Sequence, residues 1–126
     1  MNNLLDEFNV TEETYINLDK YYNILVESNK VMNLTAITEY NEAYIKHFYD
    51  SLLITKCNDE LTDIIDVGSG AGFPGLVLSI YNSKSKITLL EPTKKRANFL
   101  ESVKNKLKLE NVQVINERAE NIKGSY

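Results

Sequence analysis

The chain has 126 residues, of which 43% are hydrophobic and 25% are charged, which suits one small globular domain and is too short for two. It has no apolar run of about 18 residues and no basic N-terminal segment followed by a long apolar one, so we expect no membrane span, no secretory signal and a cytoplasmic location. One cysteine excludes an intrachain disulfide, one histidine beside it argues against a zinc site, and the net charge of −4 argues against non-specific nucleic-acid binding.

The N-terminal residues predict a helical cap. Thr11 is a good N-cap residue, and the two acids after it suit the first turn of a helix. Apolar residues then recur at spacings of three and four, which predicts a helix that ends near Val31. Its expected apolar face consists of Tyr15, Leu18, Tyr22 and Leu25.

A loop and a second amphipathic helix follow. Residues 33–37 break the helical period and predict a structured loop. Thr38 is the expected N-cap of a helix that ends near Thr55. Its apolar face is predicted to hold Ile45, Phe48 and Leu52, with Tyr44 beside them.

From residue 63 the pattern changes to alternating strands and helices. We predict strands at 63–67, 86–91 and 111–116, and helices at 74–81 and 93–107. Short connections of this kind give parallel strands with right-handed crossovers. The sequence therefore predicts an α/β fold, with a helical cap over residues 1–62 and the first half of a Rossmann-like, doubly wound sheet, three parallel strands, over residues 63–126.

The segment Asp63–Gly75 joins the first of these strands to a glycine-rich turn that opens a helix. The apolar, β-branched strand is typical of one covered on both faces. Four glycines follow within eight residues, at Gly68, Gly70, Gly72 and Gly75. Glycine allows sharp turns and close approach of a ligand to the main chain, and open α/β sheets bind cofactors where a strand ends.

Two cofactor interpretations compete for this turn. Residues 70–75 match the dinucleotide pattern G-x-G-x-x-G, whereas residues 66–72 match the acid-x-Gly-x-Gly-x-Gly pattern of S-adenosylmethionine enzymes. The expected strand ends at Val67, so the glycines that begin at Gly68 have the correct phase. Asp66 suits a cationic ligand and would repel a pyrophosphate. Glu91 could accept both hydroxyls of a ribose in either case, and a glycine-rich turn without a ligand is the third interpretation.

The chain resembles a known family, the bacterial small-subunit ribosomal RNA methyltransferase G family, which is also called glucose-inhibited division protein B. The similarity runs from about residue 20 to 120, in the family's order and spacing. The matching segments are Met32-Asn33-Leu34-Thr35-Ala36-Ile37, His47-Phe48-Tyr49-Asp50-Ser51-Leu52, Asp66 to Gly75, Lys95-Arg96 with Phe99-Leu100, and Arg118-Ala119-Glu120.

The resemblance implies transfer of a methyl group from S-adenosylmethionine to N7 of a guanine in 16S ribosomal RNA. Gly68, Ser69, Gly70, Gly72 and Phe73 would form the cofactor loop, Glu91 would hold the ribose, and Ala119 and Glu120 would contact the adenine. We expect no metal and no catalytic base, because guanine N7 carries a free lone pair and orientation supplies most of the catalysis.

Charge separates the two halves of the chain and indicates either an anionic partner for the second half or solvated helix faces. The resemblance implies that such a partner is 16S ribosomal RNA or the 30S subunit. Residues 1–62 carry 4 lysines and 11 acids, and residues 63–126 carry 10 basic residues and 7 acids. Lys94, Lys95 and Arg96 open a helix, where the dipole disfavours cations, so they are candidates for RNA phosphate contacts or a solvated face. His47 is expected to make a hydrogen bond between helix and loop, with RNA contact as the alternative.

The family's sheet has more strands than this sequence supplies, and the family's fourth strand lies beside the first. We therefore expect a C-terminally truncated form, with an exposed first-strand edge that favours self-association and with weak or absent catalysis alone. Three functions stay open: a methyltransferase of which this is the N-terminal portion, a cofactor-binding fragment without activity, and an NAD-type dinucleotide-binding module.

Overall fold

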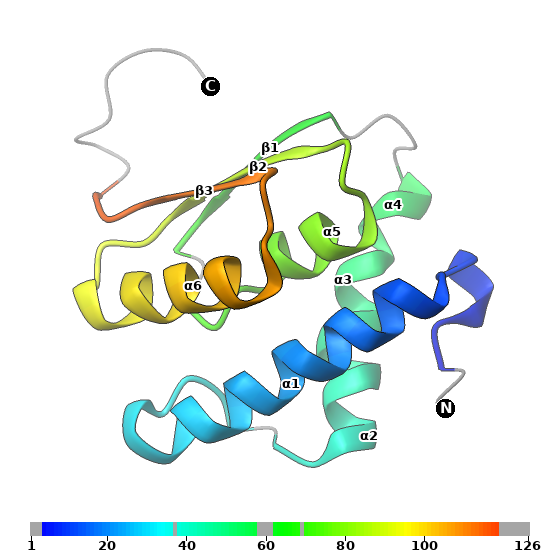
Figure 1. The fold of residues 1–126 in the computed structure, drawn as a ribbon, viewed down its shortest axis with the longest axis horizontal. Coiled ribbons are helices and arrows are strands. Elements are labelled where there is room, and N and C mark those ends of the chain that lie inside the picture. The colour runs from blue at the N-terminus through cyan, green and yellow to red at the C-terminus, as the bar shows by residue number, and fades with distance from the viewer. Residues whose placement is uncertain (1–3, 37, 58–61, 69, 119–126) are drawn as a thin grey trace.

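A computed structural model describes residues 4–36, 38–57, 62–68 and 70–118. Figure 1 shows three layers: the β-sheet, a middle layer of two helices, and the helical cap. The elements in order are the short 3₁₀-helix η1 (Asp6–Phe8), α1 (Glu12–Met32), α2 (Tyr40–Ala43), the π-helix η2 (Tyr44–Tyr49), α3 (Asp50–Leu52), α4 (Ile54–Cys57), β1 (Asp63–Val67), α5 (Gly75–Tyr81), β2 (Lys86–Leu90), α6 (Lys94–Leu107) and β3 (Val112–Ile115).

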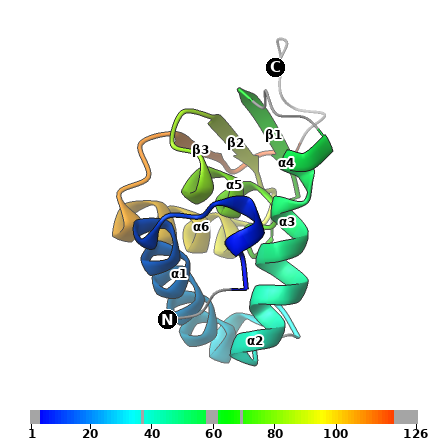
Figure 2. The same ribbon diagram turned by 90° about the vertical axis from the view of Figure 1, so that its right-hand side faces the viewer.

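The sheet has the order β1-β2-β3 and both pairs are parallel. Val67 pairs with Leu90, and Leu90 pairs with Ile115, so the three carboxyl ends lie level with one another. The two crossover helices, α5 and α6, lie on the same face of the sheet (Figure 2). This arrangement confirms the predicted α/β fold with three parallel strands.

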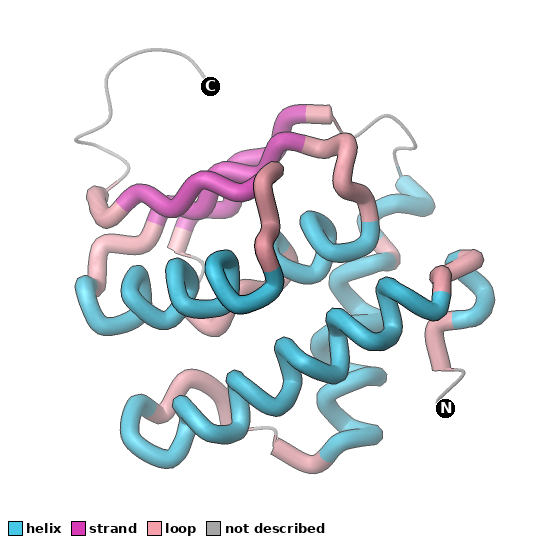
Figure 3. Tube along the Cα trace, viewed as in Figure 1, coloured by secondary structure: helices cyan, strands magenta, loops and turns pink. Residues whose placement is uncertain are grey.

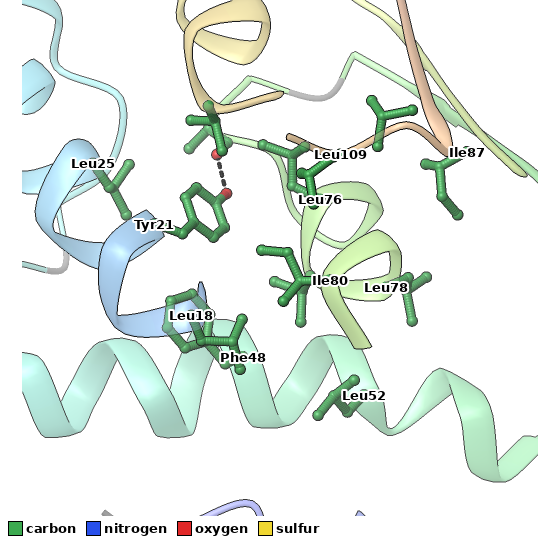
Figure 4. Packing of buried hydrophobic residues seen from close by; sticks show 14 of the residues in the cluster. Leu18, Tyr21, Leu25, Phe48, Leu52, Leu76, Leu78, Ile80, Ile87 and Leu109 are labelled. Atoms are coloured by element: carbon green, nitrogen blue, oxygen red, sulfur yellow. Dashed lines mark hydrogen bonds between the residues drawn. The ribbon is translucent and has the colours of Figure 1, made fainter. Parts of the chain in front are cut away.

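Helix α5 forms the centre of the core, between the sheet on one side and the cap on the other. All of its residues from Gly75 to Ile80 are buried, because α1 and α3 contact it from the side opposite to β1 and β2. Leu18 and Phe48 of the cap belong to the same buried cluster as Leu76 of α5 and Ile87 of β2 (Figure 4). Cap and sheet therefore share one continuous hydrophobic core.

The cap differs from the prediction in which side chains face that core. Thr11 caps α1 as expected, with its hydroxyl accepting a hydrogen bond from Thr14 N–H. Tyr21, however, is the tyrosine that is fully buried, whereas Tyr22 is half-buried. Both tyrosines lie three or four residues from Leu18 and Leu25, so the helical period does not distinguish them. The prediction that placed Tyr22, and not Tyr21, on the buried face was wrong.

The second helix of the cap begins and turns differently from the prediction. Its N-cap is Glu39, not Thr38, because the Glu39 carboxylate accepts hydrogen bonds from Asn41 and Glu42 N–H. The helical segments from α2 to α4 follow one another almost without interruption (Figure 3). The π-helical turn rotates the chain so that Tyr44 is buried and Ile45 is 52% exposed, the reverse of the expected order.

The sheet elements begin and end within one residue of the predicted bounds. The strand that precedes the glycine-rich turn is somewhat more open than its sequence suggested, since Val67 is 60% exposed and Ile64 and Ile65 are half-buried. Within the described part of the chain, β1 pairs only with β2, so it forms an edge of the sheet. No helix in the described ranges is both long and apolar enough to cross a membrane.

Candidate functional site

The glycine-rich turn lies at the carboxyl edge of the sheet, between β1 and α5. Gly68, Gly70 and Gly72 all have positive φ, at +71°, +57° and +102°. Gly68 N–H donates a 2.7 Å hydrogen bond to the carbonyl of Leu90, which continues the ladder between β1 and β2 by one residue. The chain then reverses to begin α5 on one face of the sheet. The backbone of the turn therefore lies beside the carboxyl ends of β1 and β2.

Two of the glycines are required because other groups approach them closely. A Cβ atom at Gly72 would lie 2.5 Å from the hydroxyl oxygen of Tyr21, and one at Gly75 would lie 2.9 Å from Asp66 Oδ2. Atoms cannot approach a Cβ so closely. A side chain at position 72 would therefore push the turn away from α1, and a side chain at position 75 would push α5 away from the sheet. The course of the turn therefore depends on close packing at Gly72 and Gly75 as well as on the positive φ angles.

Asp66 holds the start of α5. Its Oδ2 accepts a 3.0 Å hydrogen bond from Gly75 N–H. A carboxylate is favoured at this end of a helix, where N–H groups lack partners within the helix. The sequence suggested that Asp66 faces a cationic ligand, and the structure shows that at least one of its oxygens serves the fold.

Glu91 holds the other side of the turn. Its side chain is 3% exposed, with Oε1 accepting from Gly70 N–H and Oε2 accepting from Thr93 N–H, each at 2.8 Å. A carboxylate oxygen can accept more than one hydrogen bond, so both oxygens retain capacity for the hydroxyls of a sugar. Glu91 follows β2 directly, and its contact with Gly70 places it beside the turn.

The cap reaches the same turn through Tyr21. The Tyr21 hydroxyl, on α1, donates a hydrogen bond to the carbonyl of Ala71 (Figure 4). Burial raises the pKa of Tyr21 well above its usual value, so the hydroxyl keeps its proton and remains a donor. No motif in the sequence marks Tyr21, and the only signal for it is its spacing of three residues from Leu18 and four from Leu25.

Phe73 points toward the cap. Its ring stacks on the imidazole of His47, with centroids 4.1 Å apart and planes 8° from parallel, and it also lies near the rings of Tyr21 and Phe48. The peptide bond between Phe73 and Pro74 is cis. The backbone of Phe73 belongs to the turn as predicted, but its side chain packs on the cap.

His47 makes the predicted hydrogen bond between helix and loop. Its Nε2 lies 2.9 Å from Thr35 Oγ1, in the loop after α1. Burial lowers the pKa of His47, and the charge of Asp50 opposes this only in part, so the imidazole is neutral at neutral pH. His47 therefore joins the loop after α1 to the last part of the glycine-rich turn.

The other predicted residues lie on the same edge or outside the described residues. Lys94, Lys95 and Arg96 are exposed in the first turn of α6, three to five residues after Glu91 at the carboxyl edge of the sheet. Ser69, Ala119 and Glu120 lie outside the described residues. No group of three or more potential metal ligands occurs in the described ranges.

The site offers backbone groups and two carboxylates. Asp66 and Glu91 bring negative charge to the ends of adjacent strands, and the N–H at the start of α5 already has a partner. Such a site suits a ligand that carries hydroxyl donors and positive charge, and it is unfavourable for a pyrophosphate. The described residues of the turn include no side chain that could act as a nucleophile or a base.

Comparison with known proteins gives one consistent family. A family model described as "rRNA small subunit methyltransferase G" matches residues 14–126. A ribosomal RNA small subunit methyltransferase G of Mycoplasma mycoides subsp. mycoides is 47% identical over 117 residues, which cover 91% of this chain and 85% of that protein.

Longer relatives carry the same name. Those of Fusobacterium nucleatum and of a Thermoanaerobacter species are 52% and 53% identical over 104 and 105 residues, which cover 82% of this chain in each case. The matched regions are 45% and 44% of those two proteins, so the chain spans a little under half of their length.

Proposed function

The chain belongs to the rRNA small subunit methyltransferase G family, and from this premise we propose that it binds S-adenosylmethionine at the glycine-rich turn. We further propose that the protein methylates N7 of a guanine in 16S ribosomal RNA. The substrate is the RNA of the small ribosomal subunit, either free or in the 30S particle, which also makes the cytoplasm the proposed site of action.

The observation that carries this proposal is the position of Glu91. Its buried carboxylate lies at the end of β2 and contacts Gly70 of the turn, and both of its oxygens can accept further hydrogen bonds. A ribose placed over the ends of β1 and β2 would present its two hydroxyls to this carboxylate. A nucleoside cofactor therefore fits the residues present.

The start of α5 favours S-adenosylmethionine over a dinucleotide. Dinucleotide sites place a pyrophosphate at an open helix N-terminus. Here Asp66 occupies that position by accepting from Gly75 N–H, and its charge would repel a phosphate. β1 also ends at Val67, so the turn begins at Gly68, in the phase of the S-adenosylmethionine pattern.

The proposed mechanism needs orientation more than acid–base chemistry. When bound, S-adenosylmethionine supplies a methyl group that is activated by a sulfonium. Glu91 and the backbone of the turn would fix the cofactor, and Tyr21 and His47 would hold the turn itself. No residue needs to remove a proton, because guanine N7 attacks with a free lone pair.

Lys94, Lys95 and Arg96 are the proposed phosphate contacts. They lie at the same edge of the sheet as the turn and are exposed. Phosphate contacts position a nucleic acid without reading its sequence. Substitution of Lys95 by glutamine would then weaken binding of any RNA and leave cofactor binding unchanged.

Methyl transfer to 30S particles tests the proposal. Tritiated S-adenosylmethionine is supplied, and the RNA is digested to nucleosides. Label in 7-methylguanosine supports the proposed reaction, and label in another nucleoside contradicts it. Absence of label together with binding of S-adenosylhomocysteine would support a cofactor-binding chain that is inactive alone, and binding of NAD instead would support a dinucleotide module.

A further inference from the structure

A groove of about 440 Å³ lies beside the glycine-rich turn, on the side of the cap. Its walls come from the helical segments η2, α3 and α4 and from the last residues of the turn. The residues that line it are Lys46, His47, Asp50, Ser51, Ile54, Phe73 and Pro74. Volumes in this range are typical of sites for small ligands.

The groove has an apolar wall and two exposed charges. Ile54, which is 39% exposed, and Pro74 lie beside the stacked rings of His47 and Phe73. Lys46 and Asp50 are exposed on the helical side, and within the described residues neither makes an ion pair or a side-chain hydrogen bond. An apolar wall with one carboxylate and one ammonium group could serve the three parts of a nucleotide: the wall contacts the base, the carboxylate accepts from its N–H donors, and the ammonium group contacts a phosphate.

The Asp50 carboxylate has no hydrogen-bond or ion-pair partner among the described residues. His47, three residues before it, also lines the groove and is neutral because burial lowers its pKa. Its Nε2 is already paired with Thr35 Oγ1. Asp50 therefore offers its carboxylate to a ligand without an ion-pair partner in the described part of the chain.

We infer that this groove binds a guanine nucleotide of the RNA substrate, with the base against Ile54, Phe73 and Pro74, the Asp50 carboxylate on the base and Lys46 on a phosphate. Among the four bases, only guanine presents two adjacent donors, N1–H and the N2 amino group, to one carboxylate. RNA-binding proteins commonly read unstacked bases in this way, by their Watson–Crick edge and an apolar or aromatic surface. This inference rests on the proposed function, since it assumes an RNA substrate.

The orientation of the base has a consequence for the reaction. N1–H and N2 lie on the Watson–Crick edge of guanine, whereas N7 lies on the opposite side of the ring system. A base held by Asp50 would therefore keep N7 uncovered. The groove shares Phe73 and Pro74 with the glycine-rich turn, so the nucleotide would lie next to the proposed cofactor site.

The single histidine of the chain provides a direct probe. His47 lines the groove, so its two imidazole C–H resonances, on Cε1 and Cδ2, report on occupancy in an NMR spectrum. The 126-residue chain would be titrated at constant pH with GMP, AMP, CMP and inorganic phosphate. We expect saturable shifts with GMP at millimolar concentration and at least fivefold weaker binding of AMP and CMP.

Variants separate the contributions of base and phosphate. Asp50→Asn should reduce the ratio of GMP to AMP affinity to about one, and Lys46→Gln should weaken both nucleotides equally. Glu42→Gln, an exposed acid on α2 outside the groove, should change neither. Calorimetry with S-adenosylhomocysteine should give the same affinity for Asp50→Asn as for the unchanged chain, which distinguishes failure of this inference from failure of the proposed cofactor site.

Three results would overturn the inference. These are the absence of a saturable shift with GMP, an equal response to all nucleotides or to phosphate alone, and a preference for GMP that survives in Asp50→Asn. The first two results are measured on the unchanged chain, so they do not depend on the folding of a variant.

Discussion

The hydroxyl of Tyr21 donates a hydrogen bond to the carbonyl of Ala71, 50 residues further along the chain. This bond joins the longest helix of the cap to the middle of the glycine-rich turn. Both groups are buried, and Gly72 leaves the space that the hydroxyl needs. The cap is therefore part of the proposed cofactor site and does more than cover the core.

Tyr21→Phe should loosen the turn. The buried carbonyl of Ala71 would lose its donor, which typically costs about 1–3 kcal/mol of unfolding free energy. We expect that loss in urea unfolding, together with severalfold weaker binding of S-adenosylhomocysteine by calorimetry. Tyr22→Phe is the matched control, because the Tyr22 hydroxyl also donates to a carbonyl, that of Thr38, but at an exposed position. Unchanged affinity in Tyr21→Phe would show that the bond stabilises the fold alone.

Gly72→Ala should be more harmful than Gly68→Ala. Both positions have positive φ, where a side chain costs about 1–2 kcal/mol. Only at Gly72 would the new Cβ also collide, with Tyr21 and with Leu76, whereas nothing lies within 4 Å at Gly68. Thermal unfolding of the two variants measures the difference, and equal melting temperatures would mean that α1 does not approach the turn as described.

The chain should lose stability as pH rises above 10. Burial raises the pKa of Tyr15 to about 12, and it raises the pKa values of Tyr21 and Tyr44 as well. Above pH 10 an unfolded chain releases these protons while the folded chain retains them, so the folded state binds more protons and is destabilised by increasing pH. The contribution of Tyr15 is complete below pH 10 and declines progressively from pH 10 to about 12. Urea unfolding, with tyrosinate absorbance at 295 nm, checks this, and constant stability from pH 9 to 11 would contradict it.

The edge formed by β1 should promote self-association of the chain. The outer side of this strand has no partner among the described residues, and Val67 is 60% exposed at its end. Unpaired strand edges pair readily with a second chain, and a lysine on the edge opposes this. Light scattering after size exclusion should therefore show dimers or larger species, fewer of them in Val67→Lys and no fewer in Val31→Lys, which changes an exposed residue of α1. A stable monomer at all concentrations would refute this.

The strands and the crossover helices could be predicted to within one residue. Short apolar runs bounded by polar and glycine residues locate the strands, and the helices between them predict parallel pairing. The order β1-β2-β3 is a result of the structure. Glu91 was expected at the end of the second strand as a ribose-binding residue, and that role stays a prediction. Its hydrogen bond to Gly70 N–H is a contact that the structure adds. Strand ends that lie side by side can be inferred from topology alone.

The side-chain contacts of the cap could not be predicted in the same way. Tyr21 and Tyr22 both fit the helical period, and the choice depends on the position of the turn, which is distant in sequence. The π-helix changes which side chains face the core, so that Tyr44 is buried and Ile45 is exposed. No local sequence pattern predicts this π-helix. The charge of Asp66 was visible in the sequence, but its partner, Gly75 N–H, depends on how α5 is placed.

The most direct test of the central claim is calorimetry with S-adenosylhomocysteine and with NAD on the unchanged chain and on Glu91→Gln. The amide keeps the size of the side chain, but it can accept at only one of its two positions, so it cannot accept at once from Gly70 N–H, Thr93 N–H and a ribose. Glu101→Gln, on α6, is the control. We predict binding of S-adenosylhomocysteine and not of NAD, an affinity at least tenfold lower in Glu91→Gln, and no change in Glu101→Gln. Binding of NAD, or an affinity for S-adenosylhomocysteine that Glu91→Gln leaves unchanged, would contradict the proposed site.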